Sequence, residues 1–466
     1  MARTPSRSRR TRVMNTPRLT RRSFLNLAGT MSAASLLAAC ALPTAAPGTS
    51  EEAMAEPIVI GWARHGNEVS QATEDTLAGL FQEANPGVEI DALALPWSDY
   101  NTKIPIDIAG GTAPDTFTAH PALMINSHAA GGAANLTERI NAAEPGINYA
   151  DILYPGDAEF DGDIFGLPQK SCTHQIRYNK DLFAEAGLPT PGELYWSGGA
   201  DAWNFNSFVE IGQQLTKDLD GDGNPDQYAY AGIGGTGNVA MLRAAGGDIF
   251  DEAVTQCLVN SPESVSGLEY MLSLVENEII PSPELMVNEL GINFDTGRMA
   301  MAGGTTCDSV QALHPDKRLP FAWDFVVLPA GPGGFRCWGD TDQSVVSTSS
   351  ANPDEAFDWI VFRASLDAWE QAYDGGMKLA FTDGPTRWST FDSRAFTEPL
   401  GELDIPMIKE GYRHTNPDPF VPRSKDPYRV LFSIYATEIN NMLRGTKTPQ
   451  EAADDACALI DSEILA

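Results

Sequence analysis

The sequence predicts an α/β protein, which we expect to be made of two lobes, and three observations indicate the α/β class and the size. An apolar strand at residues 57–62 is followed by a helical pattern and by a second, alternating strand at 88–95, an order typical of a parallel strand pair joined by a crossover helix. Further strand and helix patterns continue beyond residue 300. The length of 466 residues, with 42% hydrophobic residues, is enough for two or three domains.

The chain is expected to cross between the lobes within residues 161–183. A short apolar strand should end at Pro168, because proline cannot donate a hydrogen bond to a strand ladder. Residues 169–175 are polar and are expected to form an extended connection. Asn179 should then cap a short helix that stops at Gly187.

Several motifs in this region and around it resemble those of one family. Gly166-Leu-Pro168, Tyr178-Asn-Lys-Asp-Leu-Phe183 and the following Ala-Gly-Leu resemble the first hinge of family 1 extracellular solute-binding proteins, the maltose-binding-protein-like receptors of ABC importers. Gly111-Thr-Ala-Pro-Asp115 resembles the family's Pro-Asp signature, and Trp203-Asn-Phe-x-x-Phe208 resembles its Trp-x-x-Phe helix start. Gly303-Gly-Thr305 departs from the pattern, because many relatives have a tryptophan there, and this weakens any transfer of their sugar contacts.

The resemblance covers nearly all of residues 57–466 and implies a type II periplasmic-binding-protein-like fold with an open α/β sheet in each lobe. The implied lobes close on a ligand by hinge bending. Lobe 1 is expected to comprise residues 57–173 and 340–380, and lobe 2 residues 174–339 and 381–466. The crossings between them are expected near residues 172–176, 327–346 and 378–383.

The N-terminal 40 residues predict an export signal. Arg21-Arg22 leads into an apolar run at residues 27–39, which is too short to span a bilayer comfortably and resembles a twin-arginine signal. The run ends in Leu-Ala-Ala-Cys40, which resembles a lipobox and implies cleavage before Cys40 and a lipid on its sulfur. Residues 1–40 are therefore a predicted lipoprotein signal peptide and residues 41–56 a flexible tether, made mostly of Ala, Pro, Thr, Ser, Gly and Glu without periodicity. The expected location is the outer side of the cytoplasmic membrane or the cell envelope.

The charge of the remaining chain limits its partners. Residues 1–40 hold eight of the 31 basic residues and none of the 63 acidic ones, so the rest has a net charge of about −40. Nucleic acid and anionic membrane surfaces are poor partners for such a body, because both favour clustered Lys and Arg. The expected partners are a small solute and the permease subunits of an ABC transporter, with the membrane reached only through the lipid, and the chain is expected to be a monomer.

Five cysteines remain after Cys40, an odd number without Cys-x-x-Cys spacing, so a zinc site is unsupported. Buried, inert thiols are the favoured interpretation. A disulfide between Cys307 and Cys337, formed outside the cell, is the alternative.

Ligand residues are expected where predicted strands end, because open α/β sheets bind ligands beyond the carboxyl ends of their strands. Tryptophans outside evident helices, among them Trp62 and Trp97, can stack on sugar faces, although core packing explains each of them equally well. Trp203, in contrast, is expected to pack. The predicted ligand-binding residues are Arg64, His65, Asp115, Thr118, His120, Trp338, Asp340, Arg387 and Trp388.

An acidic loop predicts a structural calcium site or, equally, a solvated turn. Its loop positions follow the spacing of oxygen ligands that wrap around Ca²⁺, but position twelve is Ala229 in place of the bidentate glutamate. No cofactor is otherwise required. The candidate ligands are Asp218, Asp220, Asp222, Asn224 and Asp226.

The function predicted is that of an extracytoplasmic receptor that captures a sugar or oligosaccharide, and not an enzyme. The pattern Gly232-x-Gly234-x-x-Gly237 is a weak match to a dinucleotide fingerprint, and no Gly-x-Ser-x-Gly, Walker loop or His-Glu-x-x-His is present. A secreted carbohydrate hydrolase stays open as an alternative, because 63 acidic residues allow many carboxylate pairs. A nutrient-sensing protein for a membrane partner is a further alternative with the same fold.

Overall fold

The computed structural model describes residues 56–142, 148–154, 158–232, 236–283, 285, 291–313, 318–377, 384–415, 424 and 426–466. Residues 56–466 form one compact unit. The predicted signal peptide, Cys40 and nearly all of the predicted tether lie outside the described residues, as does the predicted crossing at 378–383. Within the described ranges, no helix is both long enough and apolar enough to cross a membrane.

The first part of this unit alternates strands and helices, as the sequence predicts. Its strands are β1 (Ile58–His65), β2 (Val88–Leu95), β3 (Thr116–Ala119), the short hairpin β4 (Glu159–Phe160) and β5 (Asp163–Ile164), and β6 (Leu167–Asn179). Its helices are α2 (Glu68–Ala84), α3 (Trp97–Gly110), α4 (Pro121–Ala129), α5 (Thr137–Ala142) and the 3₁₀ turn η1 (Tyr149–Asp151).

The second part begins with α6 (Lys180–Ala186), which Asn179 caps and Gly187 ends in a left-handed conformation, as predicted. Its strands are β7 (Tyr228–Ala231), β8 (Met299–Thr305), β9 (Trp323–Val326) and β10 (Gly339–Val346). Its helices up to β10 are α7 (Pro191–Gly198), α8 (Phe205–Leu215), α9 (Thr236–Ala244), α10 (Pro262–Glu276) and α11 (Thr306–Ser309), with η3 (Gly199–Asp201) and η4 (Val310–Leu313). After β10 follow α12 (Pro353–Ala364), α13 (Leu366–Asp374), η6 (Trp388–Asp392), α14 (Arg394–Leu400), α15 (Ile405–His414), η7 (Arg429–Tyr435), α16 (Ala436–Leu443), α17 (Pro449–Ile460) and η8 (Asp461–Leu465).

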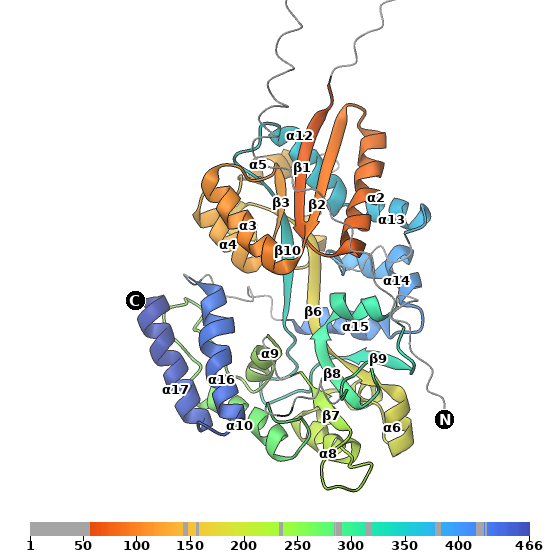
Figure 1. Cartoon of the computed structure of the whole chain (residues 1–466), viewed down its shortest axis with the longest axis vertical. Coiled ribbons are helices and arrows are strands. Elements are labelled where there is room, and N and C mark those ends of the chain that lie inside the picture. The colour runs from red at the N-terminus through yellow and green to blue at the C-terminus, as the bar shows by residue number, and fades with distance from the viewer. Residues whose placement is uncertain are drawn as a thin grey trace, which may run out of the picture. The chain divides into compact units, whose positions relative to one another are not determined.

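The strands form two groups that share β6. The first strand group has the order β2-β1-β3-β10-β6, with β1, β2 and β3 parallel and β10 antiparallel to its neighbours. The second strand group consists of β6, β8, β7 and β9. Figure 1 shows β6 passing from the group with β1, β2 and β3 to the group with β7, β8 and β9.

Strand β6 corrects the expectation that the strand ends at Pro168. It pairs with β10 over Leu167–Thr173 and with β8 and β9 from His174 on, so the predicted polar connection is itself a 13-residue strand. Pro168 is tolerated because the register of β10 shifts beside it, at Asp342 and Gln343. The polar residues 169–175 are paired on the strand instead of forming a loop.

Buried apolar residues from both parts form the cores. One cluster contains residues of β8, α8, α10 and the C-terminal helices, and a second contains residues of β1, α2, α12 and α13. Trp203 is fully buried in the first cluster and its Nε1 donates to the Val327 carbonyl (2.9 Å), so it packs as expected.

The cysteine expectations are wrong in two respects. Cys172 is bonded to Cys307, and Cys257 is bonded to Cys457, so four of these cysteines are not thiols and Cys307 does not pair with Cys337. Cys337 is a buried free thiol, as the favoured interpretation required of all five. Sequence separations of 135 and 200 residues hide both pairs from any local pattern.

Candidate functional site

The carboxyl ends of β1 and β3 hold two histidines. His65 is the last residue of β1, and His120 follows β3 and is the N-terminal cap of α4. Because β1 and β3 are parallel neighbours, both side chains lie at the same edge of the first strand group. Four rings meet at this edge: His65, Trp97, His120 and Tyr428, which are called the ring cluster below.

The ring cluster joins the start of α3 to the C-terminal helices. Ring centroids are 4.6 Å apart for His65 and Trp97, 4.9 Å for Trp97 and His120, and 5.6 Å for His120 and Tyr428. Tyr428 immediately precedes η7, whose Val430 packs in the core of the second strand group. Trp97 is 46% exposed and Tyr428 37% exposed, so two flat apolar surfaces are open to a ligand.

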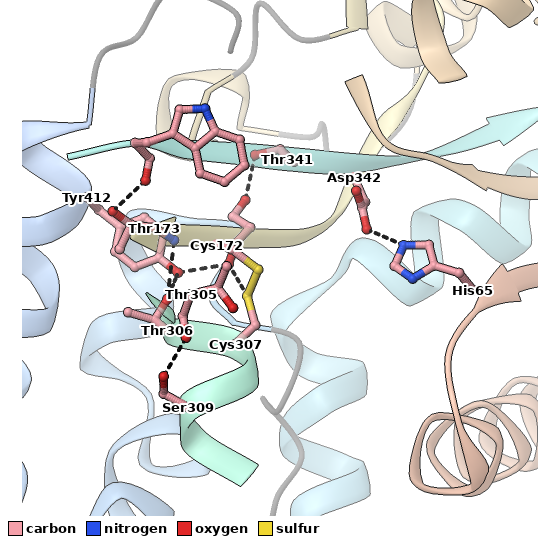
Figure 2. The surroundings of a disulfide bond; sticks show 12 residues. His65, Cys172, Thr173, Thr305, Thr306, Cys307, Ser309, Thr341, Asp342 and Tyr412 are labelled. Atoms are coloured by element: carbon pink, nitrogen blue, oxygen red, sulfur yellow. Dashed lines mark hydrogen bonds and ion pairs between the residues drawn. A yellow bond between two sulfur atoms is a disulfide. The ribbon is translucent and has the colours of Figure 1, made fainter. Parts of the chain in front are cut away.

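A buried carboxylate lies beside these rings. Asp342 Oδ2 is 2.8 Å from His65 Nε2, a contact that Figure 2 also shows. Burial alone raises the pKa of Asp342, but the neighbouring His65, Lys170 and His120 outweigh it and lower the pKa to about 2. Asp342 is therefore an ionised hydrogen-bond acceptor at neutral pH.

His120 and Tyr428 are neutral at this edge. Burial lowers the pKa of His120 to about 4, and its Nε2 is 2.7 Å from Asn101 Oδ1. Burial raises the pKa of Tyr428 to about 12, and the charges of Asp342 and Asp340 act in the same direction. The site thus combines neutral hydrogen-bonding rings with carboxylates, a set that suits hydroxyl groups.

The adjoining face of β6 and β10 adds further polar groups. Asp340 and Asp342 are two residues apart and therefore point to one face of the sheet. Their partners on β6 are Cys172 and Lys170, which share that face. Lys170 and Asp340 are partly exposed. The predicted ligand residues His65, His120 and Asp340 are thus brought into one region.

Arg64 corrects a prediction, because its side chain belongs to the interior. Successive strand residues point to opposite faces, so Arg64 and its neighbour His65 cannot both line the site. The guanidinium of Arg64 is buried and bonds to Glu74 Oε1 at 2.7 Å. Arg363 contacts the same carboxylate at 2.5 and 2.9 Å, and Trp62 Nε1 donates to it at 2.9 Å.

Asp115 and Thr118 also have structural partners. Asp115 precedes β3 and so lies at the amino edge of the sheet, away from His120; it accepts hydrogen bonds from the Gly61 N–H (2.9 Å) and the Ser350 hydroxyl (2.6 Å). Thr118 is fully buried and donates to Gln169 Oε1. Neither side chain faces the ring cluster.

The two tryptophans favoured by the sequence also lie elsewhere. Trp338 is buried in the core of the second strand group, against His174, with ring centroids 5.1 Å apart. Trp388 packs on Phe391 (6.1 Å), and Arg387 forms an isolated bridge with Ile152. Among the described residues, no contact joins Trp388 or Arg387 to the ring cluster.

The acidic loop fits a calcium ion in part. One carboxylate oxygen from each of Asp218, Asp220 and Asp222 lies within 4.8 Å of the others, and all three residues are exposed. Asp226, at the ninth position, instead accepts a bond from Arg298 (2.9 Å) and two from backbone N–H groups. Of the dinucleotide-like pattern, Gly234 lies outside the described residues.

Three surface cavities in the described part of the chain lie on the second strand group, and no predicted ligand residue lines them. Their volumes are about 580, 670 and 440 Å³. The first is bounded by Phe205 and Tyr270, the second by Trp196, and the third by Arg243 and His414. The ring cluster is a better candidate than these cavities, because it combines strand ends, exposed rings and the ionised carboxylate of Asp342.

Comparison with known proteins identifies the family. The family described as bacterial extracellular solute-binding proteins matches residues 65–368, which is more than half of the chain and includes most of the site. This chain belongs to that family. Relatives include binding proteins of Brucella abortus and Brucella suis, 25% identical over 297 residues that cover 62% of this chain and 67% of each relative.

Solved structures of substrate-binding proteins and of a receptor share the fold. An ABC substrate-binding protein of Listeria monocytogenes, solved with cycloalternan, is 20% identical with a TM-score of 0.71, and the GacH receptor of Streptomyces glaucescens is 18% identical with a TM-score of 0.70. A solute-binding protein of Agrobacterium vitis, solved with D-mannitol, is 19% identical with a TM-score of 0.67. Each comparison covers 87% of this chain and 98% of the other, and together they show the two-lobed fold of this family.

Sequence reasoning did not select Asp342 or Tyr428, and it ranked Trp97 below other tryptophans. A signal for Asp342 was present, because it lies two residues after the predicted Asp340 on one strand and must share its face. Tyr428 gave no signal, since it reaches the site only through the packing of the C-terminal helices.

Proposed function

We propose that this chain is the extracytoplasmic receptor of an ABC importer and that it captures a sugar or polyol at the ring cluster. The observation that carries the proposal is the ring cluster around ionised Asp342, at the carboxyl ends of parallel strands. Trp97 and Tyr428 offer apolar faces for a sugar ring, and Asp342 and Asp340 offer acceptors for its hydroxyl groups.

Tyr428 links the two strand groups at the proposed site. It belongs to the segment that packs on the second strand group, yet its ring contacts His120 at the edge of the first. A solute bound between them would contact both strand groups and favour their closed arrangement. The related structures support this class of ligand, because they were solved with cycloalternan, D-mannitol and ribitol.

The proposal extends to location and partners. The predicted lipid on Cys40 would hold the receptor at the outer side of the cytoplasmic membrane, where it delivers its solute to permease subunits as a monomer. The bound solute is released unchanged, so the chain acts as a binder and not as a hydrolase.

A thermal-shift screen tests the proposal. Residues 41–466, which include the whole compact unit, are heated with D-mannitol, ribitol, D-tagatose, maltotriose, acarbose and cycloalternan. A ligand at about a hundred times its dissociation constant should add about 2.7 kcal/mol of stability. We expect one sugar or polyol to raise the midpoint and to be recovered intact; cleavage of the solute would favour the hydrolase, and no shift with any of them would remove the carbohydrate assignment.

A further inference from the structure

The Cys172–Cys307 disulfide lies where the two strand groups meet. Cys172 is on the part of β6 that pairs with β10, two residues before the strand changes partner to β8 and β9 at His174. Cys307 is the second residue of α11, which directly follows β8. Figure 2 shows the bond joining strand β6 to this short helix. The disulfide therefore links the first strand group to the β8 corner of the second.

Two glycines from other segments of the chain come close to the same point. Gly339, which begins β10, lies so close that an added Cβ would be 2.6 Å from the Cys172 carbonyl oxygen. Gly384, the first described residue after 378–383, has φ +78°, and an added Cβ would collide with the Ser171 carbonyl and lie 3.3 Å from Cys307 Sγ. Only glycine permits both approaches. The disulfide is thus surrounded by β6, the start of β10 and the segment that begins at Gly384.

Neutral hydrogen bonds from β6 surround the disulfide; Thr173 Oγ1 alone contacts the Trp338 and Gly411 carbonyls and Thr415 Oγ1. The Thr173 N–H donates to Thr306 Oγ1 (3.2 Å), and the Tyr412 hydroxyl donates to the Ser171 carbonyl (2.8 Å). The hydroxyl oxygens of Thr306 and Tyr412 are 3.2 Å apart and share a hydrogen bond. Figure 2 shows these side chains gathered around the disulfide. Neutral hydrogen bonds contribute little net free energy each, so the covalent bond is the strongest link here.

The nearby free thiol does not disturb the disulfide. Burial raises the pKa of Cys337 to about 12, and its thiol contacts Thr173. Disulfide exchange requires a thiolate, which Cys337 forms only to a very small extent at neutral pH. The Cys172–Cys307 pairing is therefore stable beside it.

We propose that the Cys172–Cys307 disulfide is a hinge clamp, which limits how far the two strand groups separate and so positions the ring cluster for solute capture. The clamp rests on the receptor function proposed above. It raises the fraction of molecules in the binding-competent arrangement, and the apparent dissociation constant varies inversely with that fraction. Its loss should weaken solute binding about three- to ten-fold on this reasoning.

The second disulfide provides a matched control. Cys257–Cys457 lies within the core of the second strand group, so the variant Cys257→Ala/Cys457→Ala loses a disulfide without releasing the hinge. The test variant is Cys172→Ala/Cys307→Ala. Non-natural residues that carry fluorophores replace Glu83 and Leu459, which are both exposed. The distribution of distances between the two fluorophores is then measured without ligand in wild type and in both variants. The dissociation constant for the solute found in the screen is measured by calorimetry on unlabelled protein.

We expect the clamp variant to show a broader distance distribution and a three- to ten-fold weaker affinity, as reasoned above, with both quantities unchanged in the control variant. A clamp variant with the wild-type distribution and an affinity within about two-fold of wild type would overturn the proposal, as would tighter binding. If wild type binds no solute, the proposed receptor function is wrong. The ligand-free distance distributions of wild type and the clamp variant still test whether the disulfide limits the separation of the strand groups.

Reduction provides a second route if the clamp variant does not fold. In the Cys257→Ala/Cys457→Ala variant a dithiol can reduce only Cys172–Cys307: the S–S bond takes two electrons and two protons, giving two thiols, and the dithiol becomes a cyclic disulfide. The distance distribution should broaden on reduction and narrow again on reoxidation. Mass spectrometry confirms that reduction is complete. If the distance distribution is then unchanged, the clamp proposal is also overturned.

Discussion

Replacing Glu74 by Gln should destabilise the first strand group strongly, because Glu74 is the counterion of two buried arginines. Its carboxylate is fully buried and bonds to Arg64 Nη1 at 2.7 Å and to Arg363 Nη2 at 2.5 Å. The amide of glutamine has the same shape but no charge, so both guanidiniums would remain buried without a counterion. Breaking a buried ion pair in this way costs about 3–5 kcal/mol.

The loss is measurable by calorimetry. In a lobe of about 200 residues each kcal/mol lowers the midpoint by about 2–4 °C, so Glu74→Gln should lower that of the first lobe by about 6–20 °C. Glu83→Gln is the matched control, because Glu83 is on the same helix α2 but exposed, and it should change stability by less than about 0.5 kcal/mol. A loss below about 1 kcal/mol in Glu74→Gln would refute the role of Glu74 as an essential counterion.

The stability that Glu74 contributes should depend on pH in a defined direction. Burial raises the pKa of Glu74, but the charges and hydrogen bonds of Arg363 and Arg64 outweigh it, so the pKa lies below the usual value of 4.5. The ionised carboxylate therefore contributes its stability above pH 4.5, and the contribution is lost as the pH falls through the lowered pKa. The difference between wild type and Glu74→Gln should accordingly shrink below pH 4.5.

Three further predictions concern the ring cluster and the acidic loop. Asp342→Asn should weaken solute binding about 10- to 100-fold, because it removes an ionised acceptor that contacts His65, and calorimetric titration measures the change. Tyr428→Ala should weaken binding more than Tyr428→Phe, which keeps the ring that faces His120; equal losses would show that only the hydroxyl matters. Ca²⁺ should raise the unfolding midpoint of wild type by relieving repulsion among the clustered carboxylates, and should do so less in Asp220→Asn; equal shifts would argue for a solvated turn.

Local sequence rules predicted the features of the fold that depend on neighbouring residues. Asn179 caps α6 and Gly187 ends it, because a side-chain cap and a left-handed glycine act within a few residues. Strand β6 was misread for the same reason. Its polar residues resemble a loop locally, and only pairing with the distant β10, β8 and β9 makes them a strand.

The sequence predicted which site residues lie at the ends of strands, but not where their side chains point. A strand end tells which edge of a sheet a residue reaches, and on that basis His65 and His120 were placed correctly in one region. It does not tell which face the side chain takes, and Arg64 turned to the interior, where Glu74 is its partner. Asp115 shows a second limit, since it precedes its strand and lies at the opposite edge.

The disulfides were beyond local reasoning altogether. Cys172 and Cys307 come together only because β6 and β8 are paired next to them, from His174 and Thr305 onward. Five cysteines cannot all pair, and Cys337 is a free thiol, but the count does not assign partners among the five residues.

The most direct test of the central claim is a calorimetric titration of wild type and Asp342→Asn with the sugar or polyol that shifts the unfolding midpoint. We expect one solute molecule per wild-type chain, an affinity reduced at least about ten-fold in Asp342→Asn and unchanged in Glu83→Gln, and a solute recovered intact. Equal affinity in wild type and Asp342→Asn would contradict the placement of the solute at the ring cluster.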